Sequence, residues 1–178
     1  MKKKFKKNKG ILFWITGVSG AGKTSLARNI LKRIKLKYGP TISISGDEFR
    51  KMFDLYKFTK KEREKNYIKY LRFAKFITDQ NVNVVFDLIG LYHKARSWNR
   101  KNIKNYVEIY IKTDIQKIIR FNKKKIYKSD KKNIIGLSIK AEYPKNPDII
   151  IENNFDRSIK NLSKELLKKL NIWLFSNN

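Results

Sequence analysis

The chain has 178 residues, of which 41% are hydrophobic, and this size and composition suit one globular domain. Its 43 Lys and Arg residues against 15 Asp and Glu give a net charge of +28, so nucleic acid, an anionic membrane surface and a phosphorylated substrate are the ligand classes to consider. The lack of cysteine excludes disulfides, thiolate metal sites and cysteine nucleophiles, and is compatible with a cytoplasmic, reducing location. No stretch approaches the roughly 18 apolar residues of a membrane span.

The chain begins with a lysine-rich segment, residues 1–10, which we interpret as a basic tail before a single domain of residues 11–178. A signal peptide also joins basic to apolar residues, but the apolar run at residues 11–15 is short for one. Residues 11–16 predict a strand and the glycines after them predict a loop. Apolar positions 26, 27, 30, 31 and 34 then recur at helical spacing.

Strand and helix patterns continue to alternate. Residues 41–45, 82–89, 107–112 and 148–151 predict strands, and residues 92–105 and 159–173 predict helices. Thr59 and Glu62 form a capping-box pattern before a helix whose apolar stripe includes Tyr67 and Tyr70, and Asp114 is expected to cap another helix. Residues 123–147 lack a pattern and are interpreted as a lid. The alternation predicts an α/β fold: a mostly parallel five-stranded sheet with helices on both faces.

The sequence GVSGAGKT at residues 17–24 matches G-x-x-x-x-G-K-[ST] between a predicted strand and helix, the context that a phosphate-binding loop requires. In such a loop, backbone N–H groups and the helix N-terminus surround phosphate oxygens. We expect Lys23 to reach the β- and γ-phosphates of ATP and Thr24 to supply a hydroxyl to Mg²⁺. The pattern predicts a P-loop NTPase three-layer sandwich that binds ATP through Gly17, Ser19, Gly20, Ala21, Gly22, Lys23, Thr24 and Ser25.

A carboxylate ends the third predicted strand. Asp87 could hold Mg²⁺ directly or through water, or it could be a solvated or structurally bonded residue. The string DLIG at residues 87–90 also fits the D-x-x-G of GTPases. Against a GTPase, the segment NKKK at residues 122–125 offers no following carboxylate to read guanine.

Residues 10–153 resemble the adenylylsulfate kinase family. The segment ILFWITG leading into SGAGKT is similar to the family's first strand and phosphate loop, and GDEFR at residues 46–50 is similar to its Asp-Gly-Asp-Asn-Ile-Arg. Phe58 and Thr59, with Arg63 and Asn66, resemble Phe-Ser-x-x-Asp-Arg-x-x-Asn. The segment YPKNPD at residues 143–148 resembles Pro-x-Asn-Pro-Asp. These motifs occur in the family's order.

The resemblance implies transfer of the ATP γ-phosphate to the ribose 3′-hydroxyl of a nucleotide that carries a mixed anhydride, with ATP and Mg²⁺ as cofactors. By this resemblance Asp47 is a proton acceptor or a ligand of a Mg²⁺-bound water, although an acid at a helix N-terminus can also be purely structural. The resemblance also implies a cation in the lid, Lys124, which lies near Tyr127 in the sequence. The side chains that it implies for binding the acceptor are those of Arg50, Phe58, Arg63 and Asn66.

Four positions depart from the family pattern and leave the acceptor open. Ser45 replaces an Asp, Gly90-Leu91 replaces Ser-Pro, Asn122 replaces an Asp, and Leu137 replaces a Phe expected to sandwich the acceptor base. Residues 92–108 and 133–136 resemble a branch of the family associated with surface-polysaccharide synthesis. One activity of that branch is phosphorylation of cytidine diphosphoramidate. The acceptor is therefore adenylylsulfate or a related nucleotide such as the cytidine compound.

Two other classes of function remain as alternatives. One is a nucleic-acid-binding protein, which the charge favours but the even spread of lysines and the lack of an RNA-binding aromatic signature do not. The other is a nucleotide-binding protein without catalysis, which Ser45 and Asn122 keep open. We prefer a cytoplasmic small-molecule kinase, and family members often form homodimers.

Overall fold

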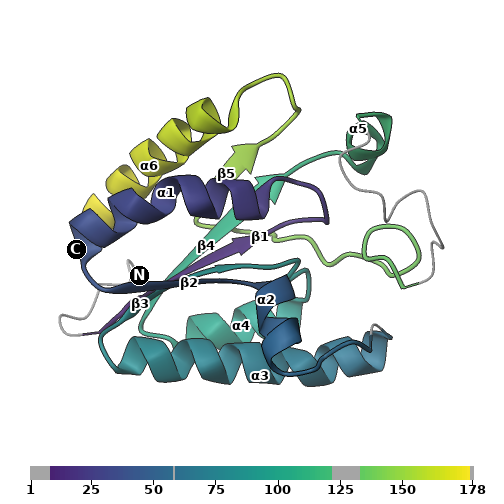
Figure 1. Ribbon diagram of the computed structural model, residues 1–178, viewed down its shortest axis with the longest axis horizontal. Helices are drawn as coiled ribbons and strands as arrows, with labels where there is room; N and C mark the ends of the chain where they lie inside the picture. The colour runs from purple at the N-terminus through teal and green to yellow at the C-terminus, as the bar shows by residue number, and fades with distance from the viewer. Residues whose placement is uncertain (1–8, 58, 122–132, 177–178) are drawn as a thin grey trace.

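The computed structural model describes residues 9–57, 59–121 and 133–176, and Figure 1 shows their arrangement. The strands are β1 (Ile11–Thr16), β2 (Thr41–Ser45), β3 (Asn83–Asp87), β4 (Asn105–Lys112) and β5 (Ile149–Glu152). The helices are α1 (Lys23–Tyr38), α2 (Gly46–Met52), α3 (Lys60–Asp79), α4 (His93–Asn102), α5 (Ile115–Arg120) and α6 (Ile159–Phe175). The predicted alternation of strands and helices is confirmed.

The five strands form one parallel sheet in the order β2-β3-β1-β4-β5. After β1 the chain crosses to β2 and β3 on one side, and after β3 it crosses to β4 and β5 on the other. The strand order therefore reverses beside β1, where open α/β sheets bind ligands at the carboxyl ends of their strands.

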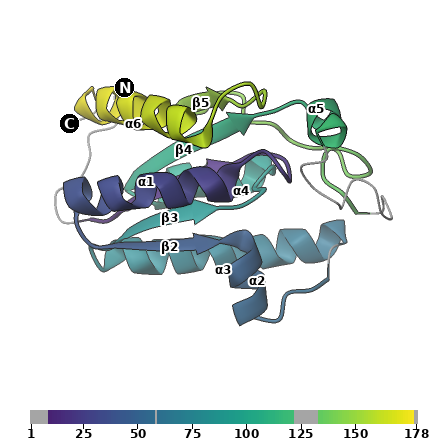
Figure 2. The same cartoon turned by 45° about the horizontal axis from the view of Figure 1, so that its top comes forward.

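Helices cover both faces of the sheet. In Figures 1 and 2, α1 and α6 lie together on one face, and α3 and α4 lie together on the other. The short helices α2 and α5 follow the carboxyl ends of β2 and β4. This is the predicted three-layer α/β sandwich. Within the described residues, no helix combines the length and the apolar character needed to cross a bilayer.

Burial explains which strands are central. Every residue of β3 is buried, as are residues 12–16 of β1, because helices cover both of their faces. In β5, at the edge, buried and exposed side chains alternate. The Trp14 ring packs edge-on against Phe86 of the neighbouring strand, with ring centroids 5.5 Å apart. The apolar run that predicted β1 is thus the centre of the core.

The helix α2 was not predicted as a separate element. Its N-cap is Ser45, whose Oγ accepts from the Glu48 N–H at 3.1 Å, while Glu48 Oε2 accepts from the Ser45 N–H at 2.7 Å. The pair is a full capping box. At α3 the predicted capping box gives one bond, from the Glu62 N–H to Thr59 Oγ1 at 3.3 Å. Ser45, a departure from the family pattern, therefore has a structural role.

The buried side chain of Asn83 joins three elements. Its Oδ1 accepts from the Ile11 N–H at 2.9 Å, and its Nδ2 donates to the Tyr38 carbonyl at 2.8 Å. We expect Asn83→Ala to lower the free energy of unfolding by about 1–3 kcal/mol, because two partly buried backbone groups lose their partner. The exposed Asn29, which bonds within α1, supplies the control: Asn29→Ala should cost under about 0.5 kcal/mol. Urea denaturation measures both values, and equal losses would contradict the assigned role.

Candidate active site

The phosphate loop joins β1 to α1 and adopts backbone angles that suit glycine. Gly17, Gly20 and Gly22 have φ of 152°, 80° and 91°. Gly22 is the N-cap of α1, which has no side-chain cap and no acid in its first turn. The N–H groups and the positive end of this helix are thus available to an anion.

The neighbouring strands fix this loop from two sides. The Gly17 N–H donates to the Ile89 carbonyl at 3.3 Å, in the segment after β3. Asn153, in the first turn after β5, donates from Nδ2 to the Ala21 carbonyl at 3.0 Å. Asn153 is buried, and it approaches Gly22 so closely that a Cβ there would lie 3.0 Å from Nδ2. Asn153 was not predicted as a site residue, since no local pattern marks the contact.

Lys23 begins α1 and is buried with its amine turned back into the loop. Its Nζ donates to the Val18 carbonyl at 2.7 Å. A lysine held inside the loop is poised to reach a phosphate that enters the loop. Ser19 and Gly20 are partly exposed, and Ser25 is exposed one position beyond Thr24. The structure therefore gathers the predicted ATP-binding residues at one loop and helix end.

Thr24 and Asp87 meet beside the loop. The Thr24 hydroxyl donates to Asp87 Oδ2, and Asp87 is only 4% exposed at the carboxyl end of β3. Burial raises the pKa of the Asp87 carboxyl, and the hydrogen bond from Thr24 and the charge of Lys23 oppose that rise. Oxygen donors of this kind suit Mg²⁺, which commonly takes one or two protein ligands and completes its shell with water and phosphate oxygens. The described residues contain no cluster of three or more carboxylates or histidines that could hold a metal unaided.

Asp47 and Arg50 lie on one face of α2, on the same sheet edge as the loop. The buried ring of Phe49 anchors the helix: it packs against Phe53, Tyr70, Phe73 and Phe86. Asp47 and Arg50, three positions apart, form an ion pair, and the Asp47 side chain is 76% exposed. Since β2 pairs Ser45 with Asp87, the start of α2 lies at the end of β3.

A cleft next to this helix is lined by basic and aromatic side chains. Its lining residues are Arg50, Lys57, Arg63, Asn66, Tyr67, Tyr70, Leu88 and Ile89. Three of the predicted acceptor-binding residues are therefore brought together: Arg50, Arg63 and Asn66. Tyr67 and Tyr70 were predicted only as part of the apolar stripe of α3. Tyr67 lies four positions after Arg63 and Tyr70 four positions after Asn66, and this spacing on one helical face is the signal that places them there.

The cleft is electropositive, and some of the residues that line it are buried. Its described lining holds three cations and no carboxylate. Burial lowers the pKa of the Arg63 guanidinium, while it raises that of the Tyr67 hydroxyl, so both groups are hydrogen-bond donors at neutral pH. Arg63 Nη2 also donates to the Asn133 carbonyl at 3.0 Å, which links α3 to the described part of the predicted lid, residues 133–147.

The remaining predicted residues lie elsewhere. Phe58, Asn122, Lys124 and Tyr127 are outside the described residues, so their predicted roles stay predictions. Leu137 is 39% exposed and is not part of the cleft lining.

Gly90, another departure, has φ of 53° and lies close to β1. A Cβ at this position would be 3.0 Å from both Thr16 Oγ1 and Trp14 Nε1.

The Asp87 carboxyl should contribute less to the stability of the unliganded protein at neutral than at acid pH. The folded-state pKa lies above the ordinary value, so this carboxyl's contribution to stability falls as pH rises through that folded pKa. Asp87→Asn keeps an acceptor for Thr24 and removes the charge. We expect this variant to be at least as stable as the wild type at pH 7, with the difference shrinking toward pH 4. Thermal unfolding at both values checks this.

The control for this experiment is Asp156→Asn, at a carboxylate that is 65% exposed. Its stability should match the wild type within about 0.5 kcal/mol at both pH values. If Asp87→Asn were less stable than the wild type at pH 7 and this loss shrank toward pH 4, the ionised carboxylate would be stabilising and the buried-charge interpretation would be wrong.

Comparison with known proteins gives the family. The Adenylylsulphate kinase family model matches residues 9–152. The cytidine diphosphoramidate kinase of Campylobacter jejuni is 32% identical over 168 residues, which cover 92% of this chain and 98% of that protein. The adenylyl-sulfate kinase of Halothermothrix orenii is 30% identical over 162 residues, covering 88% and 87%. The APS kinase of Mycobacterium tuberculosis, solved with AMPPNP and APS, superposes with a TM-score of 0.78 at 25% identity, covering 92% and 98%.

These matches span nearly the whole chain and include the phosphate loop, α2 and the basic cleft. The chain therefore belongs to the adenylylsulfate kinase family of P-loop phosphotransferases.

Proposed function

We propose that the protein transfers the γ-phosphate of ATP to the ribose 3′-hydroxyl of cytidine diphosphoramidate. The observation that carries the chemistry is the basic cleft, whose wall includes Ile89, the residue bonded by the first glycine of the phosphate loop. An anionic acceptor in the cleft lies next to the anionic donor in the loop. Phosphoryl transfer depends mainly on such positioning and on charge stabilisation.

Each residue at the sheet edge has a part in this transfer. Lys23 and the N-terminus of α1 bind the phosphates of ATP, and Arg50 and Arg63 bind those of the acceptor. Asp47 accepts the proton of the attacking hydroxyl or holds a metal-bound water. Mg²⁺, held through Thr24 and Asp87, would supply positive charge to the transferring group.

The identity of the acceptor rests on the relative from Campylobacter jejuni, which matches almost end to end. The departure at Gly90-Leu91 supports the same acceptor, because it alters the loop that lines the cleft. Cytidine diphosphoramidate is used in surface-polysaccharide decoration, which is the process we propose for this protein.

Adenylylsulfate is the second candidate acceptor. Arg63 and Asn66 match positions that bind the acceptor nucleotide in the family, and they permit either acceptor. The relative from Halothermothrix orenii is named adenylyl-sulfate kinase. This acceptor would assign the protein to sulfate assimilation.

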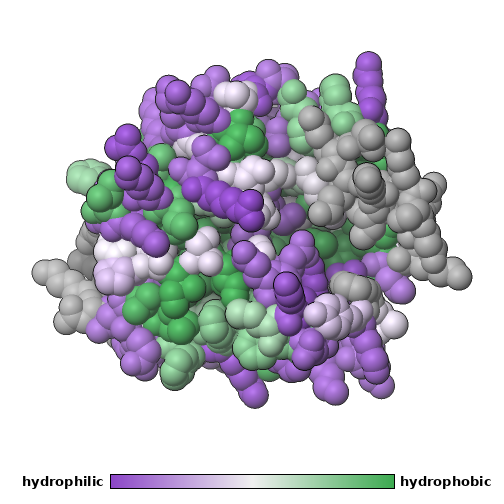
Figure 3. Space-filling model, in the orientation of Figure 1, coloured by the Kyte–Doolittle hydropathy of each residue, from purple (hydrophilic) through white to green (hydrophobic). Residues whose placement is uncertain are grey.

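Binding of nucleic acid is less well supported than a kinase function. On the face seen in Figure 3, hydrophilic side chains are scattered over several elements and alternate with hydrophobic ones, instead of forming one stripe. A homodimer and a cytoplasmic location stay predictions.

The acceptor is tested by ADP release from Mg-ATP with each nucleotide at equal concentration. We expect kcat/KM for cytidine diphosphoramidate to exceed that for adenylylsulfate by at least about tenfold, since a site built for one base leaves polar groups unpaired with the other. Lys23→Ala, which removes the phosphate-binding amine, gives the background rate. A preference for adenylylsulfate would select the second candidate, and turnover of neither would overturn the kinase proposal.

Asp47→Asn tests the proposed role of that carboxylate. We expect kcat to fall by about 100-fold or more while KM for ATP changes less than about twofold, because the loss concerns proton transfer. Asp54→Asn is the matched control, since it removes the same charge from the exposed segment just after α2, and Asn tolerates its φ of 51°. Equal kcat values for the two variants would remove Asp47 from the chemistry.

A further inference from the structure

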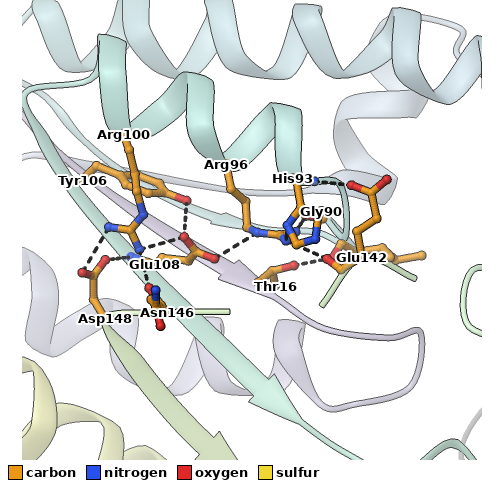
Figure 4. Close-up of polar contacts among 11 residues, drawn as sticks. Thr16, Gly90, His93, Arg96, Arg100, Tyr106, Glu108, Glu142, Asn146 and Asp148 are labelled. Carbon is orange, nitrogen blue, oxygen red and sulfur yellow. Dashed lines mark hydrogen bonds and ion pairs between the residues drawn. The ribbon is translucent and has the colours of Figure 1, made fainter. Parts of the chain in front are cut away.

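A buried carboxylate on β4 lies between two guanidinium groups of α4, as Figure 4 shows. Glu108 has a side chain 3% exposed, and its Oε1 is 3.1 Å from Arg96 Nε while its Oε2 is 2.9 Å from Arg100 Nη2. The Arg96 side chain is 5% exposed. Burial raises the pKa of Glu108 and lowers that of Arg96, which is the mark of charges held away from water.

Stability alone does not account for such a cluster. Buried ion pairs cost much to desolvate, and apolar side chains of similar volume often replace them without loss. A buried guanidinium does supply what apolar groups lack, because its donors point in fixed directions and can hold several acceptors at once.

Arg96 uses its donors to hold two distant backbone segments. Its Nη1 donates to the Gly90 carbonyl at 2.9 Å, and its Nη2 donates to the Glu142 carbonyl at 2.6 Å. Nη2 also lies 2.8 Å from His93 Nδ1. Arg100 extends the same pattern, with Nη2 donating to the Asn146 carbonyl at 3.0 Å. The Arg96 side chain thus joins the loop after β3 to the segment that leads to β5.

Both segments are connected to the candidate active site. Gly90 follows Ile89, which lines the basic cleft and whose carbonyl accepts from the Gly17 N–H at 3.3 Å. The Glu142 N–H in turn donates to the Leu91 carbonyl at 3.1 Å, so the two segments also bond to each other directly above Arg96.

The returning segment reaches the site through its earlier residues. The Asn133 carbonyl accepts from Arg63, and a Cβ at Gly136 would lie 3.5 Å from Val18 Cγ1 in the phosphate loop. Residues 133–142 therefore pass from the basic cleft and the phosphate loop to the Arg96 anchor.

We propose that Arg96 is a positioning residue, which sets the basic cleft against the phosphate loop by holding the Gly90 and Glu142 carbonyls together. The effect on catalysis rests on the proposed function, whereas the effect on the two backbone segments does not. Arg96 is buried and does not line the basic cleft. Its loss should impair use of the acceptor far more than binding of ATP, because the carbonyls that it holds belong to the acceptor side.

The test compares Arg96→Lys with Arg157→Lys. Lysine keeps the charge beside Glu108 but cannot hold a carboxylate and two carbonyls with one amine. Arg157 is a matched control: its Nη2 donates to the Glu152 carbonyl at 2.8 Å and its Nη1 to Glu165 at 2.7 Å, between β5 and α6. It is thus another arginine that joins a carboxylate to a backbone carbonyl, but outside the site.

Two readouts are measured on the full chain: steady-state kinetics with Mg-ATP and the acceptor that turns over, and amide hydrogen exchange without ligands. For Arg96→Lys we expect kcat/KM for the acceptor to fall at least about tenfold, with KM for ATP within about twofold, since small misplacements of a reacting group are costly. Exchange should accelerate in residues 90–92 and 139–146 and stay unchanged in β1. Arg157→Lys should do neither.

Unchanged acceptor kinetics in Arg96→Lys, with only a lower melting temperature, would overturn the proposal, as would equal losses for ATP and acceptor. If the wild-type protein turned over neither nucleotide, the proposed function would fail and exchange alone would decide. Acceleration confined to the two segments would then support the anchor, and acceleration throughout the chain would overturn it.

Discussion

The parallel register of β3 between β1 and β2 is the constraint on which the site depends. It pairs Asp87 with Ile15 on one side and with Ser45 on the other, so three strand ends meet at one level. The phosphate loop, the strand-end carboxylate and α2 begin at that level. Since β3 is buried throughout, a shift of register would expose core side chains, and the sheet therefore fixes the site more firmly than any single loop contact.

Loops and strand ends at both edges of the sheet are held by buried polar groups that contact residues distant in the sequence. Asn153 holds the phosphate loop, Asn83 joins the opposite strand ends to α1, and Arg96 joins the segment after β3 to the one before β5. Each has several partners, which is what low-dielectric surroundings require of a buried polar side chain. These contacts restrict the positions of the segments that they join.

The sequence predicted the fold well because strand runs, glycine punctuation and helical periodicity are local signals. It also predicted the phosphate loop and the grouping of Arg50, Arg63 and Asn66. It missed α2, whose capping box begins at Ser45, and it treated Tyr67 and Tyr70 as core alone. Asn153 and Arg96 could not be found in this way, because no local pattern encodes their contacts. Asn153 contacts a residue 132 positions away, and Arg96 contacts one 46 positions away.

The position of Glu108 between Arg96 and Arg100 also bears on how this sequence has evolved. The chain contains 34 Lys, 24 Ile and 17 Asn, which are the amino acids whose codons are richest in A and T. Lysine can accumulate on solvated helix faces at little cost. At Glu108 a lysine would be costly, because the single-base change from Glu to Lys would place three cations together, with the new one buried beside Arg96. The acid at this position is therefore required by the two arginines of α4, whatever the overall composition favours.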